Sequence, residues 1–370
     1  MFLNKYIFSY DEVISILDSL TKTNSNIHKM DSIGKSYYGY DIPYYTIGNG
    51  NLDVILIAGT HGNELVTVTY IMNLIQSLLN SKSYLKKYTF HILPIINPEG
   101  YIISSSNVIH NTKNMNKKEF ENYSKKYLKL YTIDDLNVEK GLKKEKEYKK
   151  LMISSTEFID NIFLRKSVEN ILKNTNLDSS VLAVWQTNGK GIDINSNSIH
   201  EFENMRKLRN IQEYGKMRYN DIAVYIPSPN SYPGKEIFDK DVPENIALYN
   251  FVNKIYSKGN LKLFLSYHST GAQIYGYPNI NKTKPKQIDL ILNGMYNYRH
   301  FTNYDLINEK YKYGVMDYYR IALDKVITLT IELSKINGNP IGPFSNLENL
   351  QKEFNDNTKA MLYTLDKTNI

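Results

Sequence analysis

Apolar residues along this chain gather in short runs that alternate with longer stretches of helical spacing. Runs typical of buried strands occur at 42–47, 53–58, 88–95, 181–185, 222–226, 262–267, 273–277 and 326–332. Between many of these runs, apolar positions recur every three or four residues, which predicts helices at 11–21, 64–81, 242–257, 285–298 and 346–366. Such alternation predicts an α/β fold, with a central sheet flanked by helices. The segment GNGN at 48–51 is predicted to form a hairpin turn.

One segment, residues 101–184, is longer than a simple connection between two elements. Its pattern predicts helices at 117–130, 139–152 and 157–173. Residues 113–150 hold 12 lysines and 7 acidic residues, a local excess of 5 within a net charge of +7. We interpret 101–184 as a lysine-rich helical insertion within a single domain that spans 1–370. It is either a lid or docking surface that attracts an anionic polymer or a partner, or a solvated helical surface.

Histidine and glutamate follow two of the predicted strands. The stretch DVILIAGTHGNEL at 53–65 runs from a strand into a loop that carries His61 and Glu64. The strand KLFLSY at 262–267 delivers His268 at its C-terminal end. Side chains at such strand ends can converge on one metal ion. Two nitrogens and one carboxylate leave a fourth zinc position open, as a catalytic site requires.

A further glutamate, Glu332, lies within the apolar strand VITLTIEL at 326–333. Its side chain points opposite to those of Ile331 and Leu333, because successive residues of a strand face opposite sides. It either faces solvent at the strand end or stands near the metal. There a carboxylate can take a proton from an attacking water and pass it to a leaving amine.

Several motifs occur in a recognisable order along most of the chain outside the insertion. They are SIGKSYYGYDIPYYTIG at 32–48, GTHGNE at 59–64, NPEG at 97–100, WQTNGKGIDINSN at 185–197, SYPGK with the following VPEN at 231–245, SYHSTG at 266–271 and TIEL at 330–333. In this order the chain resembles the zinc carboxypeptidase family of the carboxypeptidase A type. It resembles more closely the bacterial branch that includes γ-D-glutamyl-diamino acid peptidases acting on cell-wall peptides.

The resemblance implies roles for individual residues and a mixed sheet of about eight strands. Glu332 would be the general base, Asp193 would orient a ligand histidine, and Asn195 would bind substrate. One Zn²⁺ per chain would be bound by three ligands, namely His61, Glu64 and His268.

Two departures from the family pattern concern positive charge. Lys190 stands where the family usually has the arginine that stabilises the oxyanion, and lysine keeps the charge without the two-pronged geometry. Ser196 replaces the arginine that clamps the C-terminal carboxylate of the substrate, and serine cannot form a bidentate ion pair. Either the substrate has no carboxylate at that place, or another cation fills in, such as Arg206, Arg209 or Arg218.

The family also has a mobile tyrosine that caps the substrate. It is expected a few positions before GVMDYY at 314–319, where Tyr311 and Tyr313 are the candidates. Spacing alone does not choose between them, and the alternative is that both are packing or surface aromatics.

Composition and apolar patterning restrict the kinds of metal site and the classes of protein that remain possible. There is no cysteine, so disulfides and thiolate metal sites are excluded and the ligands must be nitrogen or oxygen. No stretch of about 20 apolar residues predicts a membrane span, and the first residues lack the long apolar core of a secretory signal, so a cytoplasmic protein is expected. We find no nucleic-acid motif.

The predicted function is therefore a zinc-dependent metallopeptidase that hydrolyses a peptide or isopeptide amide by metal-activated water. The expected partner is a peptide substrate, specifically a cell-wall muropeptide with a γ-D-glutamyl linkage. Three alternatives stay open: a general metallocarboxypeptidase that removes C-terminal residues, a zinc-retaining binding protein on the same scaffold, and a deacylase acting on a non-peptide amide.

Overall fold

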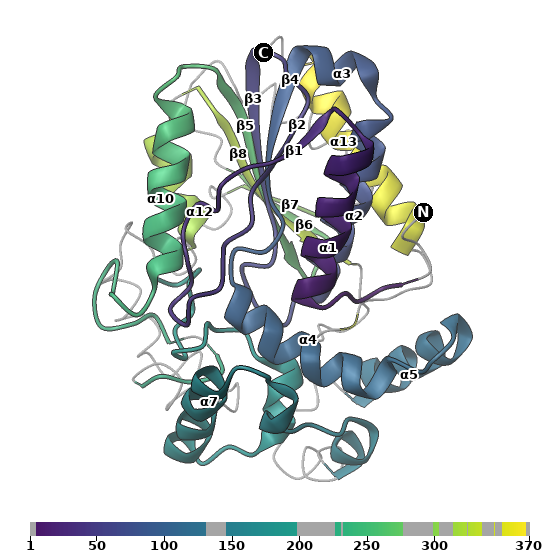
Figure 1. Ribbon diagram of the computed structural model, residues 1–370, viewed down its shortest axis with the longest axis vertical. Coiled ribbons are helices and arrows are strands. Elements are labelled where there is room, and N and C mark those ends of the chain that lie inside the picture. Colours follow the sequence, from purple (N-terminus) through teal and green to yellow (C-terminus); the bar gives the residue numbers. More distant parts are fainter. Residues whose placement is uncertain are drawn as a thin grey trace.

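The computed structural model describes residues 5–130, 146–197, 226–230, 232–276, 299–302, 314–323, 325–334, 344 and 350–367. These residues form one mixed sheet with helices on both of its faces, which confirms the predicted α/β fold (Figure 1). Within the same ranges, no helix combines the length and the apolar character that a membrane crossing requires.

The sheet has the strand order β1-β2-β4-β3-β5-β8-β6-β7. Its strands are β1 (Ile27–Lys29), β2 (Tyr45–Ile47), β3 (Leu52–Ile57), β4 (Tyr88–Leu93), β5 (Leu261–Ser269), β6 (Gln273–Gly276), β7 (Arg299–Thr302) and β8 (Ile327–Leu333). The central strands β4, β3, β5 and β8 run parallel to one another, whereas β1, β2 and β6 pair antiparallel with their neighbours β2, β4 and β8. The C-terminal ends of the parallel strands therefore meet at one edge of the sheet.

Alternate residues of the central strands fill two separate cores. On β3, Val54 and Leu56 belong to a cluster that includes residues of α1, α2 and α13. Ile55 and Ile57 belong to the cluster on the opposite face, with residues of α10 and α12. Figure 1 shows these two sets of helices on opposite sides of the sheet. Because both faces of the strand are covered, its sequence is an unbroken apolar run rather than an alternating one.

Two of the helices, α1 and α4, begin at side-chain caps. Ser9 and Glu12 form a reciprocal capping box at the start of α1, and Asn97 caps α4, whose first residue is Pro98. Helices with both ends described are α1 (Tyr10–Thr23), α2 (Leu65–Leu79), α3 (Lys82–Lys87), α4 (Pro98–Thr112), α5 (Lys117–Leu130), α7 (Ile162–Thr175), α10 (Pro243–Tyr256), α12 (Val315–Ala322) and α13 (Leu350–Lys367), with 3₁₀ helices η2 (Thr156–Phe158) and η3 (Ser179–Val184). Residues 146–151 are helical as well.

Two local predictions are wrong. The segment 48–51 does not join a hairpin, because β4 lies between β2 and β3 in the sheet. Gly50 packs there against the backbone of Lys87 and Tyr88, with no room for a side chain. The predicted strand at 181–185 is instead the 3₁₀ helix η3, whose residues Val181 and Leu182 pack in a small core with α7. The predicted strand at 222–226 lies almost wholly, and the predicted helix at 285–298 wholly, outside the described residues.

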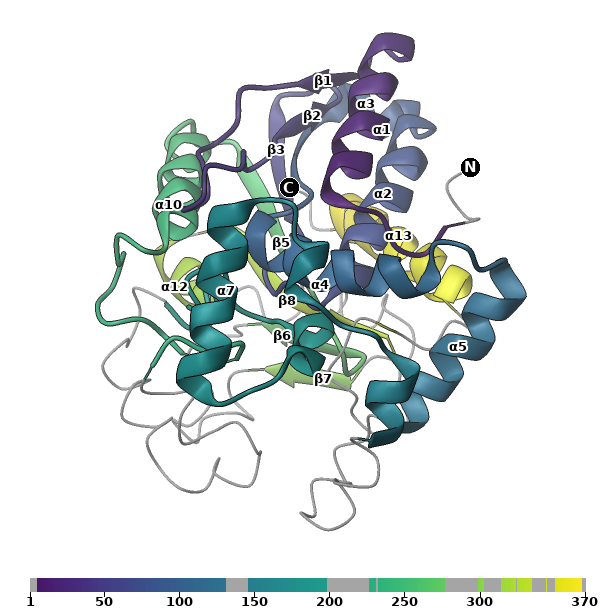
Figure 2. The same cartoon turned by 60° about the horizontal axis from the view of Figure 1, so that its bottom comes forward.

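Within residues 101–184 the described part is helical, as predicted. The helix predicted at 117–130 is α5, and α7 covers much of the one predicted at 157–173. Much of the helix predicted at 139–152 lies outside the described residues. Figure 2 shows α7 on the side of the molecule where the parallel strands end, away from α1 and α3. The interpretation of 101–184 as an inserted segment stays a prediction.

Candidate metal centre

The loop between β3 and α2 carries the first two predicted ligands. Gly59 begins it with a φ of 62°, a conformation that side-chain-bearing residues rarely adopt. A Cβ on Gly62 would lie 2.3 Å from the carbonyl carbon of Gly100 and 2.6 Å from the carbonyl oxygen of Trp185, so only glycine fits. The loop therefore passes directly over neighbouring backbone and places His61 and Glu64 on either side of Gly62.

His61, Glu64 and His268 converge at the end of the sheet. Their ligand atoms lie within 4.8 Å of one another. His61 Nδ1 lies 2.7 Å from Glu64 Oε1, His268 Nδ1 lies 3.2 Å from Glu64 Oε2, and the two Nδ1 atoms are 3.3 Å apart. All three side chains are buried, and His268 Nε2 has no hydrogen-bond partner among the described residues. Two histidine nitrogens and a carboxylate oxygen that converge in this way fit one zinc ion, and a bound ion would satisfy these buried atoms.

Charge pairing within the triad opposes the effect of burial. Burial alone would raise the pKa of Glu64, but His61 and His268 lower it to about 2. Burial alone would lower the pKa of His61, but the charges and hydrogen bonds of Glu64 and Asp193 raise it well above its ordinary value. Glu64 is thus held as a carboxylate, the form that binds a cation.

Glu332 lies on β8 directly beside His268 on β5, because the two residues are partners in the parallel register. Its side chain is partly buried. Burial and then the negative charge of Glu64 raise the pKa of Glu332 well above its ordinary value, with His61 acting in the opposite direction. A carboxyl group at the triad with such an elevated pKa is suited to accept and return a proton.

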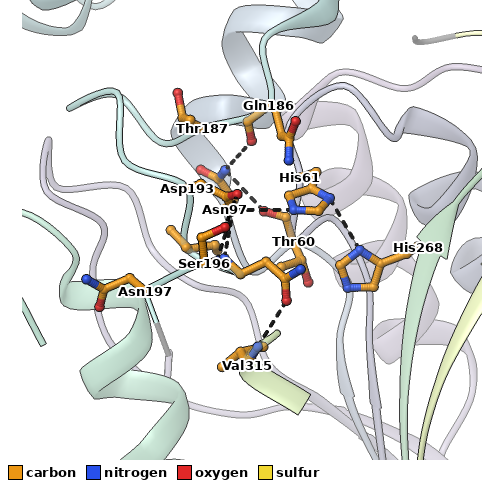
Figure 3. A network of polar contacts seen from close by, with 12 residues as sticks. Thr60, His61, Asn97, Gln186, Thr187, Asp193, Ser196, Asn197, His268 and Val315 are labelled. Carbon is orange, nitrogen blue, oxygen red and sulfur yellow. Dashed lines mark hydrogen bonds and ion pairs between the residues drawn. The ribbon is translucent and has the colours of Figure 1, made fainter. Parts of the chain in front are cut away.

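Asp193, Asn195 and Ser196 form a hydrogen-bonded cluster next to His61 (Figure 3). Asp193 Oδ1 lies 3.4 Å from His61 Nε2, and it also accepts the backbone N–H of Asn195 at 3.0 Å. Ser196 turns back and donates its hydroxyl to Asp193 Oδ2. Asn195 accepts the N–H of Val315 through its Oδ1 at 3.1 Å. The predicted contact between Asp193 and a ligand histidine is therefore present, and Ser196 is part of the same buried cluster.

Lys190 contacts Asp241 and Tyr37. Its Nζ is 4.0 Å from Asp241 Oδ1 and 4.6 Å from the centre of the Tyr37 ring. With Lys166 and Lys235 it lines a pocket of about 440 Å³. The role of Lys190 in stabilising an oxyanion stays a prediction.

Several predicted substrate contacts cannot be placed. Tyr311 and Tyr313 lie outside the described residues. The same is true of the arginines proposed to replace the missing clamp, namely Arg206, Arg209 and Arg218.

Asn97 and Gln186 are parts of the site to which sequence analysis assigned no role. Asn97 is fully buried and donates to the carbonyl oxygens of Thr60 at 3.2 Å and Gln186 at 3.4 Å, so it ties the ligand loop to the loop that leads to Asp193. Gly62 donates to the same Gln186 carbonyl at 2.9 Å. Figure 3 shows Asn97, Gln186 and His61 within one network of polar contacts. In the sequence, the feature that pointed to Asn97 and Gln186 was their position within the motifs NPEG and WQTNGKGIDINSN.

Fold and site together define an α/β protein with a mononuclear metal centre of two histidines and one glutamate at the C-terminal edge of its parallel strands. The family model described as zinc carboxypeptidase matches residues 13–360. The chain belongs to the zinc carboxypeptidase family, and zinc is accordingly the metal that its triad is placed to bind.

Individual relatives agree with this family. Over 101 residues the chain is 35% identical to carboxypeptidase B of Astacus astacus, a match covering 25% of the chain and 33% of the relative. Over 108 residues it is 30% identical to zinc carboxypeptidase A 1 of Drosophila melanogaster, covering 26% of the chain and 25% of the relative. The matched segment thus spans a third or less of either curated relative.

Solved structures support the fold over nearly the whole chain. A chain from the structure of bovine thrombin-activatable fibrinolysis inhibitor in complex with tick carboxypeptidase inhibitor superposes with a TM-score of 0.59 at 14% identity, covering 98% of both chains. The metallo-carboxypeptidase of Burkholderia cenocepacia superposes with a TM-score of 0.54 at 12% identity, covering 98% of this chain and 70% of the other. At these identities the likeness establishes the fold alone.

Proposed function

We propose that this protein is a zinc-dependent peptidase that hydrolyses a peptide or isopeptide amide bond. The observation that carries the proposal is the position of Glu332. It is the partner of the ligand His268 in the strand register, next to a complete set of three ligands. A binding protein needs the ligands to retain zinc but has no use for a proton acceptor next to them. Zinc held there would supply polarisation of the scissile carbonyl and activation of water.

Four groups of the chain divide the work in this proposal. His61, Glu64 and His268 hold the metal, and Asp193 fixes the orientation of His61. Glu332 takes the proton from the attacking water and delivers it to the leaving amine. Asn195 contacts the substrate, and Lys190 steadies the developing oxyanion after its side chain turns inward from Asp241.

For the substrate we infer a bacterial cell-wall-type peptide with a γ-D-glutamyl linkage. In this linkage the glutamyl α-carboxylate stays free beside the peptide chain, so the substrate carries a carboxylate in an unusual place. The Ser196 hydroxyl donates to Asp193, and serine supplies no positive charge at the position where the family has the carboxylate-binding arginine. Lys166, Lys190 and Lys235 line a pocket beside loop 188–193 together with Asp239 and Asp241, and these lysines are the cations with which a displaced carboxylate could pair.

A general metallocarboxypeptidase that removes C-terminal residues is the second candidate. It is favoured by the matched segments of relatives named carboxypeptidase B and zinc carboxypeptidase A 1. The position of Ser196 counts against it, because a terminal carboxylate would there meet a buried hydroxyl that already donates to Asp193.

The decisive experiment combines metal analysis with hydrolysis of two substrate classes. Wild-type protein is loaded with zinc and given a γ-D-glutamyl-diaminopimelate peptide and, separately, peptides with free apolar or basic C-terminal residues. We expect one zinc per chain, cleavage of the γ-D-glutamyl peptide, and loss of cleavage in Glu332→Gln with zinc retained. Glu169→Gln, an exposed glutamate on α7, is the matched control and should cleave as wild type does.

Other outcomes separate the alternatives. Cleavage confined to C-terminal residues would replace the cell-wall substrate with the general carboxypeptidase. Stoichiometric zinc without cleavage of any peptide would refute the peptidase and favour the binding protein or a deacylase. Absence of zinc binding would refute the metal centre itself.

A further inference from the structure

Two glutamates from separate motifs are buried together beneath the loop that leads to Asp193. Glu99 lies in the first turn of α4 and Glu244 in the first turn of α10, and both have an exposed fraction of 0%. Figure 1 shows that both helices begin at the edge of the sheet where the parallel strands have their C-terminal ends. The two carboxyl groups are close enough for the charge of Glu99 to act on Glu244. Neither belongs to the metal triad, so their burial there requires an explanation.

Each glutamate joins the same two loops at neighbouring positions. Glu99 accepts the backbone N–H of Tyr38 through Oε1 and that of Gly189 through Oε2, the latter at 3.0 Å. Glu244 interacts with the backbone of Tyr37, and its Oε2 accepts Asn188 Nδ2 at 3.4 Å. The two side chains therefore bridge loop 36–40 and loop 188–193 as a pair.

The two carboxyl groups are not equally supported as anions. Glu99 has the two N–H donors, a hydrogen bond from Ser36 and the nearby positive charge of Lys190. Glu244 Oε1 has no hydrogen-bond partner among the described residues. Burial raises the pKa of Glu99 above its ordinary value against the opposing hydrogen bonds, whereas burial and then the charge of Glu99 raise the pKa of Glu244 well above its ordinary value. A proton in this pair therefore resides on Glu244, whereas Glu99 keeps the donors that a carboxylate needs.

Other charged and titratable groups face the pair from each side. Lys190 extends from the loop above it, and Asp241 precedes α10, where its carbonyl accepts Asn188 Nδ2 at 2.9 Å. The phenols of Tyr38 and Tyr40 lie near Glu99, and burial raises the pKa of both. Lys190 is the cation among these groups, and it favours the ionised form of Glu99.

Asn188 links the glutamate pair to the metal centre. Its Oδ1 accepts the N–H groups of Lys190 at 3.0 Å and Ile192 at 3.1 Å, which fixes the turn of the loop. Trp185 Nε1 donates to the Asn188 carbonyl at 3.2 Å. Asp193, the next residue after Ile192, lies 3.4 Å from His61 Nε2. Asn188 and Asp193, which contacts a ligand histidine, are therefore five residues apart in one loop.

We propose that Glu99 and Glu244 are positioning residues for the metal centre: Glu99 as a carboxylate and Glu244 as a neutral acid hold loop 188–193 so that Asp193 stays against His61. Loss of the proton from Glu244 places two negative charges in one buried site and displaces the loop. Only the kinetic readout below rests on the proposed peptidase activity. Zinc affinity and tryptophan fluorescence test the same pair without it.

The test compares Glu244→Gln with wild type over a series of alkaline pH values. Glutamine keeps the shape of the neutral acid and cannot ionise. Trp185 is the sole tryptophan of the chain and is fully buried beside Asn188, so its emission reports the state of this loop. We expect wild type to lose zinc affinity, peptidase activity and its buried emission together as pH rises. Glu244→Gln should retain all three at pH values where wild type has lost half.

Glu99→Gln should act in the opposite sense. An amide presents one oxygen where the carboxylate presents two, so either Tyr38 or Gly189 loses its acceptor. We expect zinc affinity to fall by about 10- to 100-fold at neutral pH, as for other groups that orient a metal ligand indirectly. Gly189→Ala provides a charge-neutral route to the same effect, because a Cβ there would collide with Glu99 Oε2 and lie 2.5 Å from Leu164 Cδ1.

Asp53→Asn is the matched control, because Asp53 is another buried carboxylate and accepts from His91 Nε2 at 2.7 Å on the sheet. It should leave the pH profiles of zinc affinity and Trp185 emission unchanged. The proposal is overturned if Glu244→Gln follows the wild-type pH profiles, or if Glu99→Gln binds zinc as tightly as wild type. If no peptide is cleaved at all, the proposed function fails, while the zinc and fluorescence profiles still decide the role of the pair.

Discussion

Replacing Asp193 by asparagine isolates the contribution of one carboxylate to zinc binding. Asp193 is buried with an exposed fraction of 1%, and its Oδ1 faces His61 Nε2 at 3.4 Å. Asparagine can keep its oxygen on the N–H of Asn195, which now lies 3.0 Å from Oδ1, and place its amide group toward Ser196. The loop should therefore keep its shape, while His61 loses the negative charge that orients it and raises its basicity.

The size of the effect follows from that single loss. Removing a carboxylate that orients a ligand histidine costs about 10- to 100-fold in metal affinity. Each tenfold step corresponds to about 1.4 kcal/mol, so we expect a loss of about 1.4 to 2.8 kcal/mol in zinc binding. Asp193→Ala should lose more, because the backbone N–H groups of Asn195 and Ser196 also lose their acceptor.

Competition with a chromophoric zinc chelator at neutral pH measures this affinity directly. Asp53→Asn serves again as the control, because it breaks a buried aspartate–histidine pair of similar chemistry elsewhere on the sheet. It should lower the free energy of unfolding without altering zinc affinity. Wild-type zinc affinity in Asp193→Asn would refute the reasoning, because His61 would then be oriented by other contacts.

Three further predictions concern the ligands, the loop and pH. His268→Ala should abolish stoichiometric zinc binding and the rise in melting temperature on zinc addition, because the open centre retains two ligands; an unchanged zinc content would contradict the triad. Gly191→Ala should destabilise the chain by about 1 kcal/mol or more in denaturant titration, because Gly191 has a φ of 72° and a Cβ there would lie 2.6 Å from Ser228 N. The contribution of Glu244 to the free energy of unfolding should be full below its ordinary pKa of 4.5 and be lost as pH rises toward its raised folded-state pKa, because in that range the folded chain binds a proton that the unfolded chain has released. Glu244→Gln should remove this part of the pH dependence in denaturant titrations at several pH values.

The metal ligands were predictable from sequence because their signals are local. The run DVILIAG has the unbroken apolar character of a strand covered on both faces, and His61 and Glu64 follow it within one short loop. His268 likewise ends an apolar run, and Glu332 is a lone charge inside another. Parallel strands bring such ends to one edge of the sheet, so the local patterns indicated that these residues can meet, and the resemblance carried by the ordered motifs assigned them to zinc and to the general base.

Strand pairing and short apolar segments could not be predicted in the same way. GNGN has the composition of a tight turn, yet β2 pairs with β4, which follows it by some forty residues, and not with the adjacent β3. The run VLAVW at 181–185 is apolar because Val181, Leu182 and Trp185 pack with α7, and burial of this kind does not distinguish a strand from a 3₁₀ turn. Both outcomes depend on contacts between residues distant in sequence.

The buried polar network explains why motifs without apparent chemistry accompany the ligands. Asn97 and Glu99 of NPEG contact the loop after Trp185, and Glu244 of VPEN contacts Asn188 in that same loop. The ligand triad itself stands on strand ends and a glycine-flanked turn that are packed by apolar cores on both faces. Among the described residues, the loop with Asp193 contains no strand and is held by individual hydrogen bonds together with Ile192 and Ile194, which pack in the second core. Substitutions in NPEG and VPEN should therefore weaken zinc binding and alter its pH dependence while the sheet stays folded, whereas substitutions at Val54 or Leu265 should unfold the sheet and the centre together.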